Sequence, residues 1–320
     1  MKIALRALGV VSTLGMFLVL IMGSAVTNTG SEQGCGHSWP LCHGRLIPQM
    51  AVATAIEFSH RAVVGVESVL VIALATGVLL VYRKRTEVRI LAPVMVAFLF
   101  VQAGLGAWAV MYPQVAAILA LHFGVSLISF ASVLLTTVFL FEVDSVEELR
   151  TRPIPTAFRV FGWGVALYSY VVVYIGAFVR HTRADLSCRG WPLCNGSVYP
   201  GITGTVGHNY MHRLAAGLLV FAIVALVVWS RRLRNERPDL YRASMVAFVM
   251  VLMQSATGAL IVFTKLDLFS ALAHAAWAGM MFGSLSYLCL HVLPPSALRR
   301  MTRRGARSVP ALGEHAAAQQ

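Results

Sequence analysis

Long apolar runs separated by short polar stretches recur from the N-terminus to about residue 293. Each run has about 20 residues or more, the length that an α-helix needs to cross the hydrocarbon core of a bilayer. The pattern therefore predicts an all-α integral membrane fold with eight transmembrane helices. The expected spans are residues 4–26, 58–81, 90–110, 116–141, 158–179, 208–229, 242–263 and 269–293.

The polar positions between and within these runs occur twice, which identifies the chain as an internal duplication. CGHSWPLCHG and EFSHR in the first half match CRGWPLCNG and NYMHR in the second. An offset of 152 or 153 residues aligns Cys35 with Cys188, Cys42 with Cys194, His60 with His212, Gln102 with Gln254 and His122 with His274. Because each half has an even number of spans, we expect two four-helix bundles related by a pseudo-two-fold axis along the membrane normal.

The duplication also predicts the domain organisation. Residues 1–141 form the expected N-terminal bundle and residues 158–293 the C-terminal bundle. Residues 142–157 contain acidic residues and two prolines, so they are expected to be a cytoplasmic linker. Residues 294–320 are polar and basic, which predicts a disordered cytoplasmic tail.

The composition is typical of a membrane protein, and the positions of the basic residues account for the high net positive charge. Hydrophobic residues make up 58% of the chain and charged residues 12%, while the net charge is +13. In a soluble protein such a charge would suggest nucleic acid, but here the basic residues cluster between the spans. Placing both termini in the cytoplasm puts 19 of the 26 Lys and Arg residues inside, as the positive-inside rule requires. We therefore expect a multi-pass plasma-membrane protein with no nucleic-acid partner.

Four histidines recur as two equivalent pairs near the outer ends of the spans. His60 and His122 belong to the second and fourth spans, and His212 and His274 to the sixth and eighth. Ionisable groups inside a membrane are costly and usually functional. Two imidazoles that face each other across an apolar bundle suit six-coordinate haem iron. The sequence predicts one haem site in each half, near the extracytoplasmic side.

Other interpretations of the histidines remain. A single histidine is commonly just hydrogen-bonded between helices, and zinc is the main rival metal, although zinc needs four clustered ligands. Six further histidines have no duplicated partner and are expected in loops or on the surface: His37, His43, His181, His208, His291 and His315.

The cysteines of the two long outer loops predict disulfides, because these loops face the oxidising compartment. Their roles as structural staples or as redox-active pairs both remain open. A metal site made of Cys35, His37, Cys42 and His43 is an alternative, but the second copy has no histidines there. Cys289 lies alone near the inner end of the last span.

The two halves of the sequence differ in the acidic residues near the first histidine of each pair. Glu57 stands three residues before His60, whereas its counterpart is Asn209. Glu57 either complements a helix N-terminus or accepts a proton beside a reacting carbon. Glu67 lies two turns after His60 and either relays protons or has no catalytic role; its counterpart is Leu219.

Further polar and small residues have two interpretations each. Arg61 and Arg213 either pair with haem propionates or reach lipid headgroups. Gln102 and Gln254 either line the pockets or bridge helices. Small residues such as Gly104 and Gly258 allow close helix contacts, within one chain or between copies of a homo-oligomer.

Taken together, these motifs resemble the haem A synthases. The resemblance covers residues 1 to about 293 and rests on the order of EFSHR at 57–61, LHFG at 121–124, MHR at 211–213 and AHAAW at 273–277, with a cysteine pair in each long outer loop. It implies oxidation of the C8 methyl group of haem O to the formyl group of haem A, the haem of terminal oxidases. It also implies a haem O synthase as a partner.

Carried over by position, the resemblance implies a role for each motif. His60 and His122 would be the axial ligands of the substrate haem O, and Glu57 would take part in its oxidation. His212 and His274 would hold a resident haem b, and the four loop cysteines would form disulfides. Cys188 and Cys194 are one residue closer than the first pair.

Iron with two histidine ligands has no vacant position for dioxygen, so it suits electron transfer. We therefore expect stepwise removal of electrons from the substrate methyl group, with water as the oxygen source and electrons leaving through the haem b to an unknown acceptor. A dihaem b-type electron carrier is one alternative, although it would be expected to place haems at both membrane faces. A haem transporter or chaperone is another, since parallel repeats also occur in transporters.

Overall fold

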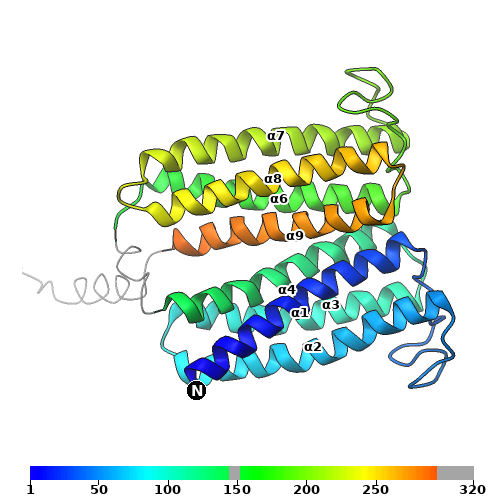
Figure 1. Cartoon of the computed structure of the whole chain (residues 1–320), viewed down its shortest axis with the longest axis horizontal. Coiled ribbons are helices and arrows are strands. Elements are labelled where there is room, and N and C mark those ends of the chain that lie inside the picture. The colour runs from blue at the N-terminus through cyan, green and yellow to red at the C-terminus, as the bar shows by residue number, and fades with distance from the viewer. Residues whose placement is uncertain (144–151, 294–320) are drawn as a thin grey trace, which may run out of the picture.

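The computed structural model describes residues 1–143 and 152–293 (Figure 1). Within these ranges the chain forms eight long helices and no strands. Their bounds are α1 Lys2–Asn28, α2 Val52–Tyr82, α3 Thr86–Met111, α4 Ala116–Glu142, α6 Thr156–His181, α7 Gly204–Arg232, α8 Pro238–Phe263 and α9 Leu268–His291. All eight are long and apolar enough to cross a membrane, which confirms the predicted fold class.

Several helices begin before the predicted apolar spans. The largest difference is at α2, which starts at Val52, six residues before the expected residue 58. Its first turns contain Thr54 and Glu57, which lower the local hydropathy but are buried inside the protein. Local signals mark some ends: Pro238 occupies the first turn of α8, and the Asp267 side chain caps α9 by accepting from the main-chain N–H groups of Phe269 and Ser270.

The helices form two rings of four. In the first ring α1 and α3 each contact both α2 and α4, and in the second α6 and α8 each contact both α7 and α9. Figure 1 shows the two bundles side by side, with the two long loops at the same end. The same pattern of contacts thus occurs in each half. A two-fold axis between the halves and the exact domain boundaries stay predictions.

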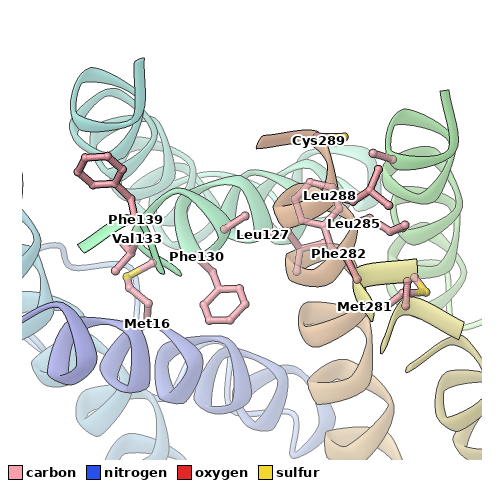
Figure 2. Close-up of a cluster of buried hydrophobic side chains, with 14 of the residues drawn as sticks. Met16, Leu127, Phe130, Val133, Phe139, Met281, Phe282, Leu285, Leu288 and Cys289 are labelled. Atoms are coloured by element: carbon pink, nitrogen blue, oxygen red, sulfur yellow. The ribbon is translucent and has the colours of Figure 1, made fainter. Parts of the chain in front are cut away.

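Helices α4 and α9 join the bundles. About 61% of the α4 span and 50% of the α9 span are buried, against 33% or less in every other helix. In Figure 2, Phe130 of α4 and Phe282 of α9 belong to one buried apolar cluster that extends across both bundles. Gly283 permits close approach, because a Cβ there would lie 2.7 Å from Leu134 Cδ2. Dispersion contacts between closely packed helices stabilise such an interface, since lipid provides little hydrophobic driving force.

A buried polar cluster connects the halves at the opposite end from the long loops. Glu142 at the end of α4 accepts a hydrogen bond from the Tyr287 hydroxyl (2.9 Å) and pairs with His291 Nε2 (2.9 Å). Arg237 donates to the His291 carbonyl oxygen (2.8 Å) and pairs with Asp239 (2.7 Å). The expectation that His291 lies in a loop or on the surface is wrong, because this residue is only 2% exposed. Its partners come from distant parts of the chain, so the apolar pattern could not place it.

The other unpaired histidines divide between loops and helices. His37 and His43 are exposed in the first long loop, as expected. His181 ends α6 and His208 lies in the first turns of α7 against the Phe178 ring, both partly buried. His315, the tail at 294–320 and most of the predicted linker at 142–157 lie outside the described residues. Cys289 is a buried free cysteine of α9.

Replacing Arg237 by Met should destabilise the protein strongly. The change removes the charge partner of Asp239 and a donor to the His291 carbonyl, and losing one member of a buried ion pair costs about 3–5 kcal/mol. The measurement is the midpoint of thermal unfolding in detergent. Arg234→Met is the matched control, because Arg234 is exposed three residues away. Equal midpoints for both variants would contradict a stabilising role for this cluster.

Candidate functional site

The four candidate histidines lie at one end of the two bundles. His60 and His212 are the ninth residues of α2 and α7, and His122 and His274 the seventh residues of α4 and α9. These four helices all begin at the end that carries the long loops (Figure 1). Within each ring the two histidine helices occupy opposite corners. Because the paired helices begin at the same end, the two histidines of each ring lie at one level of the bundle.

Each of these imidazoles lies against a glycine of the preceding helix. A Cβ built on each glycine would approach the Cε1 atom of the facing ring, at the following distances: Gly23 to His60 3.4 Å, Gly106 to His122 3.4 Å, Gly176 to His212 2.7 Å and Gly258 to His274 3.2 Å. An added Cβ would displace the ring at Gly176 and crowd it at Gly258, whereas at Gly23 and Gly106 it would only reach van der Waals contact. The glycines thus restrict the ring position most strongly in the second bundle. Sequence reasoning missed this role, although Gly106 and Gly258 occupy equivalent positions in the repeated QAGLGA and QSATGA segments.

Three of the four rings have a buried nitrogen without a partner. Nδ1 of His60, His122 and His212 makes no hydrogen bond within the described residues. His274 differs, because its Nε2 lies 3.1 Å from Gln254 Nε2 and its Nδ1 lies 3.2 Å from Thr257 Oγ1. Buried polar atoms normally have a partner, and an exception calls for an explanation such as a missing ligand. The N-terminal pair therefore suits a haem iron directly, and the C-terminal pair suits one once the Gln254 amide leaves His274 Nε2.

The contacts bear on two alternatives from the sequence: zinc as the metal, and glutamines that bridge helices. Zinc would need clustered ligands, and the described part of the chain contains no group of three or more His, Cys, Asp or Glu side chains suited to a metal ion. Gln254 of α8 contacts the His274 ring of α9, as expected for a residue that bridges helices. Gln102 behaves differently, since its Oε1 is buried without a hydrogen-bond partner.

Glu57 joins the first long loop to α2. It is 3% exposed, and its Oε2 accepts a hydrogen bond of 2.8 Å from the Cys35 main-chain N–H. Its Oε1 accepts a hydrogen bond from Arg61, one helical turn later. Arg61 also donates to the carbonyl oxygens of Ser38 (2.9 Å) and Leu41 (3.1 Å). The carboxylate is therefore held in place by two donors beside the candidate ligand His60.

Asn209 and Arg213 make the equivalent connection in the second half. The Asn209 amide donates to the carbonyl oxygens of Ala184 (2.8 Å) and Asp185 (2.7 Å) and accepts from Arg213 Nε (2.8 Å). Arg213 donates to the Cys188 carbonyl (2.9 Å). Thus Arg61 and Arg213 anchor loops, a role that neither sequence interpretation included. The partners are main-chain carbonyls, which no residue pattern reveals.

Both loops contain a disulfide. Cys35 is bonded to Cys42 and Cys188 to Cys194, with Cα atoms 4.5 and 4.6 Å apart. The first pair is therefore not available as thiolate ligands for the alternative metal site with His37 and His43. His37 instead contacts the Val110 carbonyl through Nδ1 (3.0 Å), which ties the first loop to the end of α3. The disulfides and the anchored arginines together hold each loop over the mouth of its bundle.

The chain is similar to known proteins over most of its length. A family model described as "Cytochrome oxidase assembly protein" matches residues 49–286. The chain is 42% identical over 295 residues to a protein of Bacillus licheniformis named "Heme A synthase", covering 91% of this chain and 97% of that protein. Proteins with the same name from Geobacillus kaustophilus and Geobacillus thermodenitrificans are 41% and 40% identical, covering 92% and 97% of this chain and 93% and 97% of their own lengths.

Replacing Gly176 by Ala should weaken haem binding in the second bundle. The added Cβ would lie 2.7 Å from His212 Cε1, so the ring must move away from its present position. We expect a severalfold lower haem content per protein, measured by pyridine haemochrome absorbance after purification. Gly164→Ala on the same helix is the control, because a Cβ there meets no atom within 4 Å. Equal haem contents in the two variants would show that the glycine does not position His212.

Proposed function

The chain belongs to the cytochrome oxidase assembly protein family, and we propose that it acts there as a haem A synthase. The reaction converts the C8 methyl group of haem O to a formyl group, taking one oxygen atom from water and releasing four protons and four electrons. The relatives that carry this name support the proposal. The observation that carries it for this chain is the pair of histidines at one level in each bundle, each ring lying against a glycine of the preceding helix.

The two bundles have different roles in this proposal. His60 and His122 are the axial ligands that hold the substrate haem O in the N-terminal bundle, and His212 and His274 hold a resident haem b in the C-terminal bundle. When bound, haem b supplies one-electron redox chemistry, and the final electron acceptor lies outside the chain. The contacts of His274 Nδ1 with Thr257 Oγ1 (3.2 Å) and the Gln254 carbonyl (3.1 Å) support a permanent site, because they orient the ring. The Gln254 amide, which lies 3.1 Å from His274 Nε2, would move aside when iron binds.

The chain's own residues supply binding, orientation and proton transfer. The histidines orient the substrate, and the long loops limit the entry of water. Glu57 lies one turn before His60, where a carboxylate can stabilise positive charge or accept a proton as the methyl group is oxidised. Its two hydrogen bonds anchor the first loop and keep the carboxylate in one orientation, so in this proposal the same group holds the loop and is positioned for proton transfer.

We further propose the arrangement in the cell. The chain is a multi-pass membrane protein, and the distribution of basic residues favours cytoplasmic termini, with the haem sites near the extracytoplasmic side. A haem O synthase would supply the substrate. A dihaem electron carrier is less well supported, because all four histidines lie at one end of the bundles and do not provide a path across the membrane.

The direct test is mass identification of the haems extracted from purified protein, expressed with a supply of haem O. Haem b together with haem O, its hydroxylated intermediate or haem A is the expected result. Haem b alone, with haem O shown to be available, would favour the electron carrier. Absence of haem would refute the histidine assignment.

Replacing Glu57 by Gln should leave haem O bound but reduce its conversion by at least about 100-fold, the lower end of what a positioned acid or base contributes. The Glu57→Gln variant keeps one oxygen that can accept from Arg61, and the Cys35–Cys42 disulfide together with the Arg61 bonds to the Ser38 and Leu41 carbonyls still holds the loop. The measurement is haem A formed per bound haem O, with disulfide integrity checked by thiol labelling. Unchanged conversion would eliminate a catalytic role for Glu57.

A further inference from the structure

The residue seven positions after each candidate histidine differs between the bundles. Seven residues are two helical turns, so this residue lies on the histidine's face, about 10 Å deeper. In the N-terminal bundle it is Glu67 after His60 and Ser129 after His122. In the C-terminal bundle it is Leu219 after His212 and Met281 after His274. We call Glu67 and Ser129 the polar floor and Leu219 and Met281 the apolar floor.

The polar floor is buried and incompletely hydrogen-bonded. Glu67 is 3% exposed and Ser129 is fully buried, and neither Glu67 Oε1 nor Ser129 Oγ has a hydrogen-bond partner in the described part of the chain. Glu67 Oε2 lies against Gly15 of α1, where the missing side chain leaves room for the carboxyl group. Ser12, one turn from Gly15, is also buried with an unpartnered hydroxyl. Three unpaired polar groups therefore lie at comparable depth in one bundle.

The apolar floor is packed in the ordinary way. Leu219 and Met281 are each 1% exposed and belong to the large buried cluster. Apolar residues at these positions are thus compatible with the fold. Leaving a buried polar group unpaired costs about 1–3 kcal/mol, and an apolar replacement of similar shape can be neutral or stabilising. Packing alone does not explain why polar side chains are buried at positions 67 and 129. A ligand group that forms hydrogen bonds with Glu67 and Ser129 is the natural explanation.

The proposed substrate and the proposed resident cofactor differ in one substituent at the periphery of the ring, and the polar part of that difference is a hydroxyl group. Haem O carries a hydroxyethylfarnesyl chain where haem b has a vinyl group. We propose that the polar floor binds the hydroxyl of this chain and so selects haem O for the N-terminal bundle, while the apolar floor accepts the vinyl group of haem b. This inference rests on the proposed function. The hydroxyl both donates and accepts, which suits a carboxyl group together with a serine.

Discrimination of this kind has a clear physical basis. A site built to hydrogen-bond a hydroxyl rejects the analogue that lacks it, because its own polar groups are then buried without partners. Haem b in the N-terminal bundle would leave Glu67 and Ser129 unpaired. Haem O in the C-terminal bundle would bury its hydroxyl against Leu219 and Met281. Glu67 and Ser129 are specificity residues in this proposal, distinct from Glu57 in the reaction itself.

The test compares the affinities of the N-terminal bundle for haem O and haem b by absorbance titration of protein that already holds its resident haem. Wild-type protein should prefer haem O. Glu67→Leu should reduce the ratio of the two affinities about 10- to 100-fold, as expected for one hydrogen bond to a buried, ionisable group. The farnesyl chain contributes in both proteins, so it cancels from the comparison. Glu67→Gln should retain most of the preference, because an amide still forms hydrogen bonds.

Ser126→Ala is the matched control for Ser129→Ala, because the Ser126 hydroxyl already donates to the His122 carbonyl (2.8 Å). Ser129→Ala should lower the affinity ratio severalfold, and Ser126→Ala should leave it unchanged. The resident haem spectrum reports whether each variant is folded. If Glu67→Leu does not fold, the comparison of Ser129→Ala with Ser126→Ala tests the selection of haem O by itself.

The outcomes separate this inference from the proposed function. If Glu67→Leu and Ser129→Ala keep the wild-type affinity ratio, the polar floor does not select haem O. The synthase assignment would still stand in that case, provided that wild-type protein converts haem O. If wild-type protein neither binds nor converts haem O, the proposed function fails first, and the selection of haem O fails with it.

Discussion

The placement of four half-buried imidazoles inside two apolar bundles, three of them with a buried and unpartnered Nδ1, is the constraint on which the rest of this structure depends. A ring nitrogen without a partner in an apolar interior is costly, so the surrounding helices must either satisfy it or leave room for a ligand that does. The glycines of α1, α3, α6 and α8 provide that room by letting each ring lie against the neighbouring helix. Two rings per bundle, on helices at opposite corners, are the arrangement that the proposed haem sites require.

The loop anchors follow from the same requirement. The proposed haem sites would need a cover that limits access of water, and long loops lose much conformational entropy when ordered. Each loop is therefore shortened by a disulfide and attached to the helix that carries the first histidine. Glu57 with Arg61 and Asn209 with Arg213 make this attachment with different chemistry. The anionic version in the N-terminal half can also take part in a reaction, whereas the neutral version can only hold the loop.

The repeated sequence folds into two similar bundles that differ in polarity at several buried positions. The contacts among helices are alike in the halves, and α4 and α9 pack together as their shared core. Among the positions that differ, the loop anchors and the floors exchange a polar or charged side chain for one of different chemistry. The halves thus differ in polarity rather than in architecture, as expected if one site handles a substrate and the other retains a cofactor.

Hydropathy alone determined the eight spans, because each helix must satisfy its own backbone hydrogen bonds in lipid and therefore appears as a continuous local signal. The repeat and its four histidines were equally visible, since they depend only on spacing. The early start of α2, the burial of His291, the anchoring by Arg61 and Arg213, and the glycines behind the imidazoles were decided by tertiary structure. These features depend on side chains and carbonyl groups that are distant in sequence, such as Glu142 beside His291. A local pattern records how polar a residue is, but only the packed helices determine which partner stabilises that polar group in the interior.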